Sequence, residues 1–266
     1  MEKSFERLFK LKYMISLATT IHDPNAGMEW MSDKYLEELI NLFDKVFLTS
    51  SPNTQKVYLE KLKSEDLAFN KKENNKIGIN YFDPIKRAYT KESGYIFYCD
   101  FDRILHWVKD HSKELRQLLQ GLNEKQEKID YIVAQRTEKG YKEHQDSLYF
   151  TEQLPNKIIS EKMEQTSQKD FLAGCFIFSN KAAEIVVNDG GYDNLAFFGS
   201  WPVLLKNKDV NIEYRKFKGL GWETPDWHRE EVRQAGGIAE YRTKLNSREE
   251  WRKRVRMANE FVKEII

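Results

Sequence analysis

The sequence predicts an α/β fold in which a mostly parallel central sheet is flanked by helices and followed by a C-terminal helix. Strand-like and helix-like patterns alternate over roughly the first hundred residues, as in parallel sheets whose strands are joined by crossover helices. The run Tyr95–Cys99 is continuously apolar and aromatic, which is typical of a strand buried on both faces. Near the end of the chain, Ser247 and Glu250 form a capping box ahead of apolar residues at helical spacing.

The amino-terminal half divides into short apolar runs separated by helical patterns. We expect strands at Tyr13–Ile21, Lys45–Thr49, Ile77–Asn80 and Tyr95–Cys99. We expect helices after a cap at Ser32, from Asn53 or Thr54 to Lys63, from Asp83 to Thr90 and from Ser112 to Leu122.

The carboxyl-terminal half shows the same alternation with one long interruption. We expect strands at Asp130–Ala134, Phe171–Phe178 and Val210–Tyr214, and helices at Asn180–Val187, before Leu205 and over 247–265. Residues 139–168 are polar, poor in apolar side chains and contain Pro155, so we expect a helical excursion outside the core. With no repeat or low-complexity linker, the sequence predicts one continuous domain over 1–266.

Composition narrows the function classes. The chain has 43 Lys+Arg against 42 Asp+Glu and a formal net charge of +1, which gives no electrostatic argument for nucleic-acid binding. Cys99 and Cys175 lie in predicted strands, so a disulfide framework is not expected and a reducing cytoplasm fits. No run reaches the roughly 18 apolar residues of a membrane span. The first twelve residues predict no signal peptide but a short amphipathic helix that packs on the domain, which leaves peripheral membrane contact open.

Two aspartates follow the buried run Tyr95–Cys99. Asp100 and Asp102 flank Phe101 at the carboxyl end of a strand, where open α/β sheets bind ligands. Burying two such carboxylates is costly unless a cation neutralises them. A divalent ion with oxygen ligands is the natural partner, and such ions often carry substrate phosphates. The simpler alternative is that both aspartates only end the strand and cap the next helix.

Placement, and not spacing, supports the ligand-site interpretation. With 15 Asp in 266 residues, roughly 0.8 Asp-x-Asp triplets are expected by chance, so the spacing alone is a weak signal. Here the triplet follows an apolar strand, precedes Arg103 and is followed by a second apolar run.

These features resemble the nucleotide-sugar glycosyltransferases that have the GT-A fold, a Rossmann-type sheet. The resemblance covers residues 13–228 in element order and depends on Asp100-Phe101-Asp102, on Gly174 in an apolar strand, and on His228 in a late loop. It implies a nucleoside diphosphate sugar donor and a small-molecule, glycan or lipid-linked acceptor. It also implies Mg²⁺ or Mn²⁺, a nucleotide-sugar-binding half over 13–122 and an acceptor and metal half over 129–228.

The resemblance also implies roles for individual residues. Asp102, Asp100 and His228 would hold the metal, and Asp100 would also face the reacting sugar. The residues expected to contact the donor or acceptor are Thr19, Thr20, His22, Thr49, Arg87, Arg103, Gly174, Trp201, Glu223 and Asp226. Several have simpler alternatives: Arg103 would pair with Asp100, and Trp201 would be an ordinary core residue.

The chain departs from the family at the expected catalytic acid. Inverting members usually place an acid near the position of Ser200, whereas here the nearest upstream acids are Asp189 and Asp193. Serine without a partner is a poor general base. Asp193 is therefore the expected base if the reaction inverts the anomeric carbon; otherwise the enzyme is retaining or degenerate.

Three other functions compete. A sugar-nucleotide nucleotidyltransferase would need a Gly-rich basic loop after the first strand, which residues 20–24 lack. A phosphohydrolase of the haloacid dehalogenase type would place its Asp-x-Asp after the first strand. The missing acid near Ser200 also leaves open a degenerate, non-catalytic module that binds a nucleotide sugar.

Overall fold

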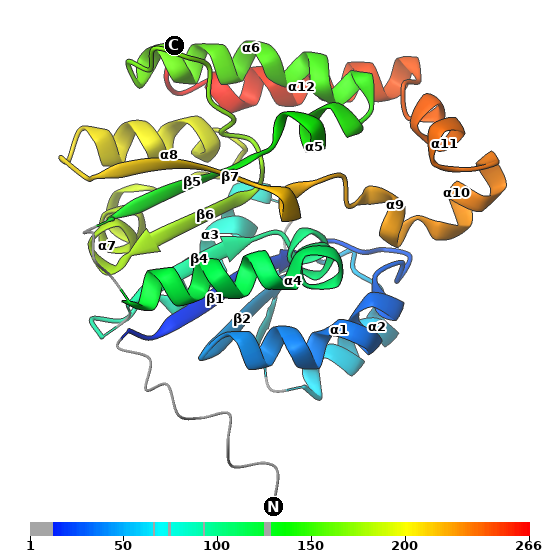
Figure 1. Cartoon of the computed structure of the whole chain (residues 1–266), viewed down its shortest axis with the longest axis horizontal. Coiled ribbons are helices and arrows are strands. Elements are labelled where there is room, and N and C mark those ends of the chain that lie inside the picture. The colour runs from blue at the N-terminus through cyan, green and yellow to red at the C-terminus, as the bar shows by residue number, and fades with distance from the viewer. Residues whose placement is uncertain (1–12, 66, 74–75, 93, 125–128) are drawn as a thin grey trace, which may run out of the picture.

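A seven-stranded sheet forms the centre of the computed structural model, which describes residues 13–65, 67–73, 76–92, 94–124 and 129–266. The strand order is β3-β2-β1-β4-β6-β5-β7 (Figure 1). The amphipathic helix expected in the first twelve residues lies outside the described residues.

The sheet is mixed but mostly parallel, as predicted. Its strands are β1 Ile15–Ile21, β2 Lys45–Ser50, β3 Ala68–Lys71, β4 Tyr95–Cys99, β5 Tyr131–Arg136, β6 Cys175–Ser179 and β7 Ile212–Phe217. Four of the six strand pairings are parallel, and β6 alone among these strands runs antiparallel to its neighbours β4 and β5. Because β6 opposes both, β4 and β5 point the same way, and their carboxyl ends meet at one edge of the sheet.

Helices follow most of the strands. They are α1 Glu29–Leu42, α2 Lys56–Lys63, α3 Ile77–Ala88, α4 Phe101–Glu124, α5 Glu138–Glu143, α6 Asp146–Lys162, α7 Asn180–Asp189, α8 Phe197–Lys206, the 3₁₀ turn η1 Lys218–Leu220, α9 Thr224–Trp227, α10 Arg229–Ala235, α11 Ile238–Lys244 and α12 Arg248–Val262. The capping prediction for α12 is confirmed, because the Ser247 hydroxyl accepts the Glu250 N–H at 3.2 Å. Within the described ranges, none of these helices has the length and apolar character needed to cross a membrane.

Both faces of the sheet are buried. Successive side chains of a strand point to opposite faces, so Leu17 and Phe97 belong to one core layer while Ala18 and Tyr98 belong to the other. Helices α1, α2 and α4 cover the first layer, and α3, α7, α8 and α12 cover the second. Burial on both faces explains why the central strands read as continuous apolar runs in the sequence.

The predicted third strand is wrong. Residues 77–80 form the first turn of α3, and the third strand is β3, Ala68–Lys71. The apolar pattern in fact continues at helical spacing to Ile85 and Ala88, which are buried. Strand β3 is a four-residue edge strand with two exposed ends, and such a strand has too few buried positions to produce an apolar run.

Three other boundaries also differ from the prediction. Ser32 lies inside α1, which begins at Glu29, and its hydroxyl bonds to Tyr58. The excursion at 139–168 does contribute to the core, since Ile159 is fully buried. The strand predicted at 171–178 begins only at Cys175, because side chains bind the preceding backbone: the Phe171 N–H donates to Asn156 Oδ1 at 2.8 Å.

Candidate active site

A cleft opens at the carboxyl ends of β1 and β4. The chain continues from β1 to β2 on one side and later adds β4 on the other side, so this is the topological switch point where open α/β sheets bind ligands. The cleft has a volume of about 440 Å³, and its walls are Thr20, Ile21, His22, Met28, Ser51, Asn53, Ile77, Asn80, Tyr81, Asp100, Asp102 and Trp227. Four predicted site residues, Thr20, His22, Asp100 and Asp102, are thus brought together.

Asp100 is held firmly at the base of this cleft. It directly follows β4 and accepts hydrogen bonds from Tyr98 Oη at 2.9 Å and Tyr81 Oη at 3.1 Å. Gly174 has a φ of +63°, and a Cβ at that position would overlap Asp100 Oδ2. Gly174, which was expected to contact the donor or acceptor, thus lies against the Asp100 carboxylate, and the missing Cβ lets this carboxylate lie close to the chain before β6.

The two aspartates have raised pKa values. Burial raises the pKa of Asp100 to about 6, although Arg103 and the two tyrosine hydroxyls oppose the shift. Burial, followed by the negative charges of Glu223 and Asp100, raises the pKa of Asp102 to about 8. Because Arg103 compensates only partly, the ionised pair lacks sufficient positive charge around it. A bound cation would supply that charge.

Arg103 forms its ion pair elsewhere. Its guanidinium donates to Glu223 Oε1 at 3.0 Å and to the Leu220 carbonyl at 3.5 Å. Both side chains of the pair are more than nine-tenths buried. The alternative in which Arg103 pairs with Asp100 is not seen, and Arg103 with Glu223 instead fixes the segment after β7 against α4.

The residues around the cleft fit a divalent ion. Among the described residues that form its walls there are two carboxylates and neither Lys nor Arg. A bound diphosphate would therefore meet negative charge without a compensating side chain. Carboxylate oxygens are the ligands that Mg²⁺ and Mn²⁺ prefer, so Asp100 and Asp102 suit an ion that neutralises both the pair and a diphosphate.

Several wall residues were missed by sequence reasoning. Ser51 and Asn53 follow β2 directly, and Ser51 Oγ lies 2.7 Å from His22 Nδ1. The strand-end rule that singled out Asp100 applies equally to these two residues and would have found them. Asn80 was missed because its segment was predicted to be a strand, and Tyr81 because it fell between that predicted strand and the predicted helix at 83–90.

Thr49 and Arg87 lie outside the cleft walls, in a polar cluster that joins β2 to α3. Arg87 donates to Asp83 at 2.9 Å, to Thr49 Oγ1 at 2.9 Å and to the Leu48 carbonyl at 2.8 Å. Thr49 Oγ1 in turn donates to Asp83 Oδ2 at 2.7 Å. These bonds join β2 to α3. They occupy most of the Arg87 N–H groups, so few remain to bind a nucleotide-sugar donor.

Thr19 and Trp201 are both fully buried. Trp201 packs among Phe176, Phe178 and other rings of the second core layer, and its indole N–H donates to the Gly190 carbonyl at 2.7 Å. Its ring is therefore enclosed by protein and is not presented to a sugar. Trp201 is therefore a core residue, as the simpler alternative stated.

Asp193 lies beside the cleft and not in its wall. Its carboxylate is exposed and pairs with Lys76 Nζ at 2.5 Å. Its carbonyl accepts the Gly78 N–H at 3.2 Å, which places the segment against the first turn of α3, where Ile77 forms part of the wall.

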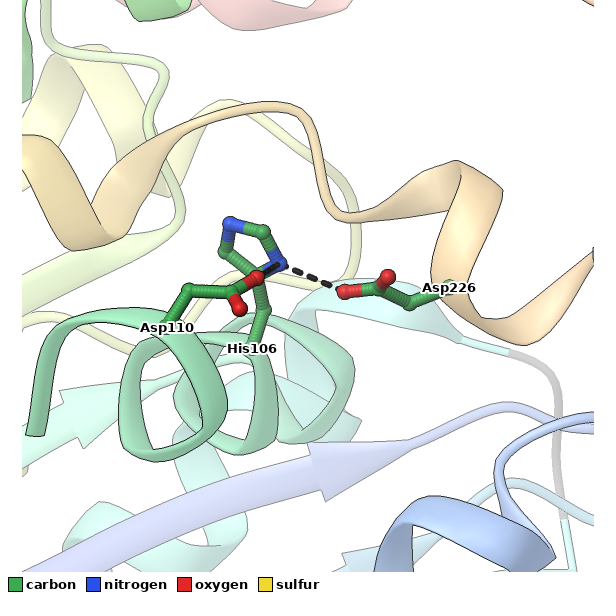
Figure 2. Close-up of side chains that lie close together, drawn as sticks. All are labelled: His106, Asp110 and Asp226. Carbon is green, nitrogen blue, oxygen red and sulfur yellow. Dashed lines mark hydrogen bonds and ion pairs between the residues drawn. The ribbon is translucent and has the colours of Figure 1, made fainter. Parts of the chain in front are cut away.

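Asp226 anchors the helix that carries the wall residue Trp227. Figure 2 shows His106 and Asp110 on α4 facing Asp226, with His106 Nδ1 2.6 Å from Asp226 Oδ2. Lys109 Nζ lies 3.0 Å from Asp226 and 2.7 Å from Asp110. These side chains have the donor atoms of a metal site, but the Lys109 ammonium already forms ion pairs with both carboxylates.

His228 follows Trp227 at the end of α9. Its Nδ1 lies 3.2 Å from Glu231 Oε1, and its ring lies 3.9 Å from that of Trp227. The histidine is thus next to the cleft along the chain, and its imidazole is directed to α10.

A second group of buried charges lies near the end of β5. Arg136 donates to both oxygens of Asp170 at 2.7 Å and to Glu152 at 2.5 Å. All three side chains are more than nine-tenths buried. Despite burial, the Arg136 charge and hydrogen bonds hold the pKa of Asp170 below its usual value.

Comparisons with known proteins give only distant matches. No protein-family model matches the sequence, and no curated protein is similar to it. Among solved structures, 4-diphosphocytidyl-2C-methyl-D-erythritol synthase from Anaerococcus prevotii matches 89% of this chain and 100% of its own, with 10% identity and a TM-score of 0.47. Glucosyl-3-phosphoglycerate synthase from Mycobacterium tuberculosis, in complex with Mn²⁺, UDP-glucose and phosphoglyceric acid, matches 77% of this chain and 70% of its own, with 15% identity and a TM-score of 0.46. These likenesses are too distant to assign an activity or a residue role.

Proposed function

We propose that this protein is a metal-dependent glycosyltransferase of the GT-A type that moves a sugar from a nucleoside diphosphate to an acceptor hydroxyl. One observation supports this most strongly. Two half-buried carboxylates with raised pKa values, Asp100 and Asp102, lie in a cleft at the switch point of the sheet, and no Lys or Arg is among the described residues of its walls. A diphosphate would bind there together with a divalent ion.

Asp100 and Asp102 would hold Mg²⁺ or Mn²⁺, with His228 as the proposed third ligand. When bound, the ion would stabilise negative charge on the departing diphosphate, which is commonly a large contribution in such sites. The protein's own part is positioning: Tyr81 and Tyr98 fix the Asp100 carboxylate by hydrogen bonds. Fixed ligands lose less conformational entropy when the ion binds.

The rest of the cleft fits a nucleotide sugar. Thr20, His22, Ser51 and Asn53 supply polar atoms at the ends of β1 and β2, and Trp227 is also part of the wall. We assign the nucleotide to the polar end. Residues 139–168 and 219–228 would frame the acceptor.

Asp193 is the proposed general base if the reaction inverts the sugar. No other Asp or Glu besides Asp100 and Asp102 is among the described wall residues, and Asp193 adjoins the wall through its contact with Gly78. Losing a general base lowers turnover by about 10²–10⁴-fold. We therefore expect Asp193→Asn to lose turnover in this range while keeping its affinity for the nucleotide.

A degenerate binding module is the second candidate. It is favoured by Ser200, which stands where an acid is expected, is 5% exposed and has no hydrogen-bond partner for its hydroxyl. Such a protein would bind nucleotide and metal as described but would transfer nothing.

The decisive assay is product analysis with a set of nucleoside diphosphate sugars, Mn²⁺ and candidate acceptors. Release of a nucleoside diphosphate with a new glycoside supports the transferase, and NMR of the anomeric carbon distinguishes inversion from retention. Retention would remove the role of Asp193. Binding without turnover over the whole set would favour the binding module, and no binding of any nucleotide would reject both.

A further inference from the structure

Helices α6, α11 and α12 carry exposed apolar side chains among their charged residues. Large hydrophobic side chains that are exposed in the described part of the chain are Val57, Ile77, Phe150, Leu154, Ile238, Val255 and Ile266. Five of these seven lie on α6, α11, α12 or the last residue of the chain. Figure 1 shows α6 and α12 beside each other along one edge of the molecule, where they pack together, and α11 leads into the start of α12. Exposed apolar side chains gathered in one region indicate an interaction surface.

A row of arginines accompanies these apolar residues on α12. Arg248, Arg252 and Arg256 are four residues apart, are exposed, and line a shallow pocket together with Trp251 and Val255. Like charges at this spacing repel each other on a helix. Within the described ranges no carboxylate forms an ion pair with any of the three, whereas Arg254 of the same helix pairs with Glu250 at 2.7 Å.

The combination of charges and apolar groups limits the partner. A second copy of this chain that used the same surface in a two-fold dimer would bring the two arginine rows together, so self-association is disfavoured. A nucleic acid would neutralise the arginines but would leave Phe150, Leu154 and Val255 in water. An anionic membrane surface suits both the arginines and the apolar side chains. Lipid phosphates attract arginine, and the membrane interface accepts apolar groups.

We propose that the α6–α12 surface docks on an anionic membrane. The arginine row contacts lipid phosphates, and Val255 with Phe150 and Leu154 enters the boundary between headgroups and acyl chains. The chain as a whole carries a formal net charge of only +1, so the attraction is local to this surface. The inference does not depend on the proposed transferase activity, since the cleft and this surface share no residue.

Sedimentation with lipid vesicles tests the proposal. The full chain should pellet with vesicles that contain about 30 mol % phosphatidylglycerol and remain in the supernatant with phosphatidylcholine alone, at about 0.1 M salt, where surface charges still act over about 10 Å. Each basic residue near an anionic surface contributes about 5-fold in affinity. The double variant Arg252→Glu/Arg256→Glu should therefore bind at least about 30-fold more weakly.

A matched control has the same change in net charge. Lys86→Glu/Lys113→Glu reverses two exposed lysines on α3 and α4 and should bind the anionic vesicles as the wild type does. All replaced side chains are exposed, so circular dichroism melting should show that both double variants fold. Equal losses of binding in the two double variants would overturn the docking surface.

Val255→Ser distinguishes a membrane from a soluble polyanion. Val255 is 57% exposed, so this change should leave the fold intact and weaken vesicle binding several-fold. It should not alter binding to heparin, which offers charge without an apolar phase. The proposal is overturned if the wild type stays in the supernatant with anionic vesicles. It is also overturned if Val255→Ser binds the vesicles unchanged while heparin binds the wild type as tightly as the vesicles do.

Discussion

Two pairs of carboxylates, one buried and one half-buried, lie near the ends of parallel strands in this sheet, and they differ in whether a cation lies beside them. Asp170 and Glu152 surround Arg136 at the end of β5, and hydrogen bonds from its guanidinium reach both carboxylates. Asp100 and Asp102 follow β4, and the neighbouring Arg103 pairs with Glu223 instead. The first pair has its cation within the fold, and the second pair does not.

The pKa values show the consequence. At Asp170 the Arg136 charge and several hydrogen bonds together outweigh burial and lower the pKa, although burial still raises the pKa of Glu152. At Asp100 and Asp102 burial dominates and raises both pKa values. Burial alone therefore does not mark a functional carboxylate. The informative feature is a carboxylate in a cleft wall that is removed from water and has no ion-pair partner of its own.

The largest expected effect is on the β5 pair. Removing one partner of a buried ion pair typically costs about 3–5 kcal/mol, because the remaining charge is left buried. We expect Arg136→Ala to lower the free energy of unfolding by this amount in urea denaturation. Arg116→Ala, which removes the exposed pair with Glu38, should change it by less than about 1 kcal/mol. A loss at Arg136 as small as at Arg116 would contradict the structural role of the β5 cluster.

The next largest effect is the pH dependence of stability at the β4 pair. The pKa of Asp102 is about 8 in the folded protein and about 3.9 in an unfolded chain. Between these values the folded state keeps a proton that the unfolded state releases, so stability falls as the pH rises. The loss approaches about 1.4 kcal/mol per pH unit for one such group.

Asp102→Asn should remove this slope. With EDTA present, we expect the wild type to lose stability relative to the variant between about pH 5 and 7, as measured by urea midpoints. Asn has nearly the same shape and no charge, so the variant should be at least as stable as the wild type at neutral pH. Parallel stability curves for the two proteins would mean that Asp102 is ionised and compensated within the fold, as Asp170 is.

The smallest expected effect concerns His228. If its imidazole joins the metal ligands, His228→Ala should weaken Mn²⁺ binding by about 10-fold and leave nucleotide binding without metal nearly unchanged. If the imidazole stays with Glu231, at its distance of 3.2 Å, neither affinity should change. Equal losses in both would indicate that the segment around α9 closes over the nucleotide.

The sequence predicted six of the seven strands and the two aspartates in the cleft wall. Strand β4 is apolar at all five positions because both of its faces are buried, and this pattern placed Asp100 and Asp102 at its end. The family resemblance pointed to Thr20 and His22, and both are in the cleft wall. By contrast, β3 and the start of α3 were misassigned, because a short edge strand leaves no apolar run and because the first turn of a helix looks like a short strand.

The sequence did not show which side chains would pair with each other in the fold. Arg103 is next to Asp102 in the chain but pairs with Glu223, 120 positions away, and only the packing of η1 on α4 brings them together. Arg87 and Trp201 have residue types that suit a sugar-nucleotide site, yet one joins β2 to α3 and the other fills the core. Residue type and order along the chain identify candidates, and tertiary packing decides which of them remain accessible.

The central claim is that Asp100 and Asp102 bind a divalent cation together with a nucleoside diphosphate in the cleft. The most direct measurement is calorimetric titration of a nucleoside diphosphate into wild type and Asp102→Asn, each with Mn²⁺ and with EDTA, using the nucleotide that gives the largest thermal shift. The account predicts tight binding only for the wild type with Mn²⁺. It also predicts that Asp102→Asn binds weakly in both conditions while keeping the melting temperature of the metal-free wild type or exceeding it. Binding by Asp102→Asn that equals the wild type in the presence of Mn²⁺ would contradict the claim.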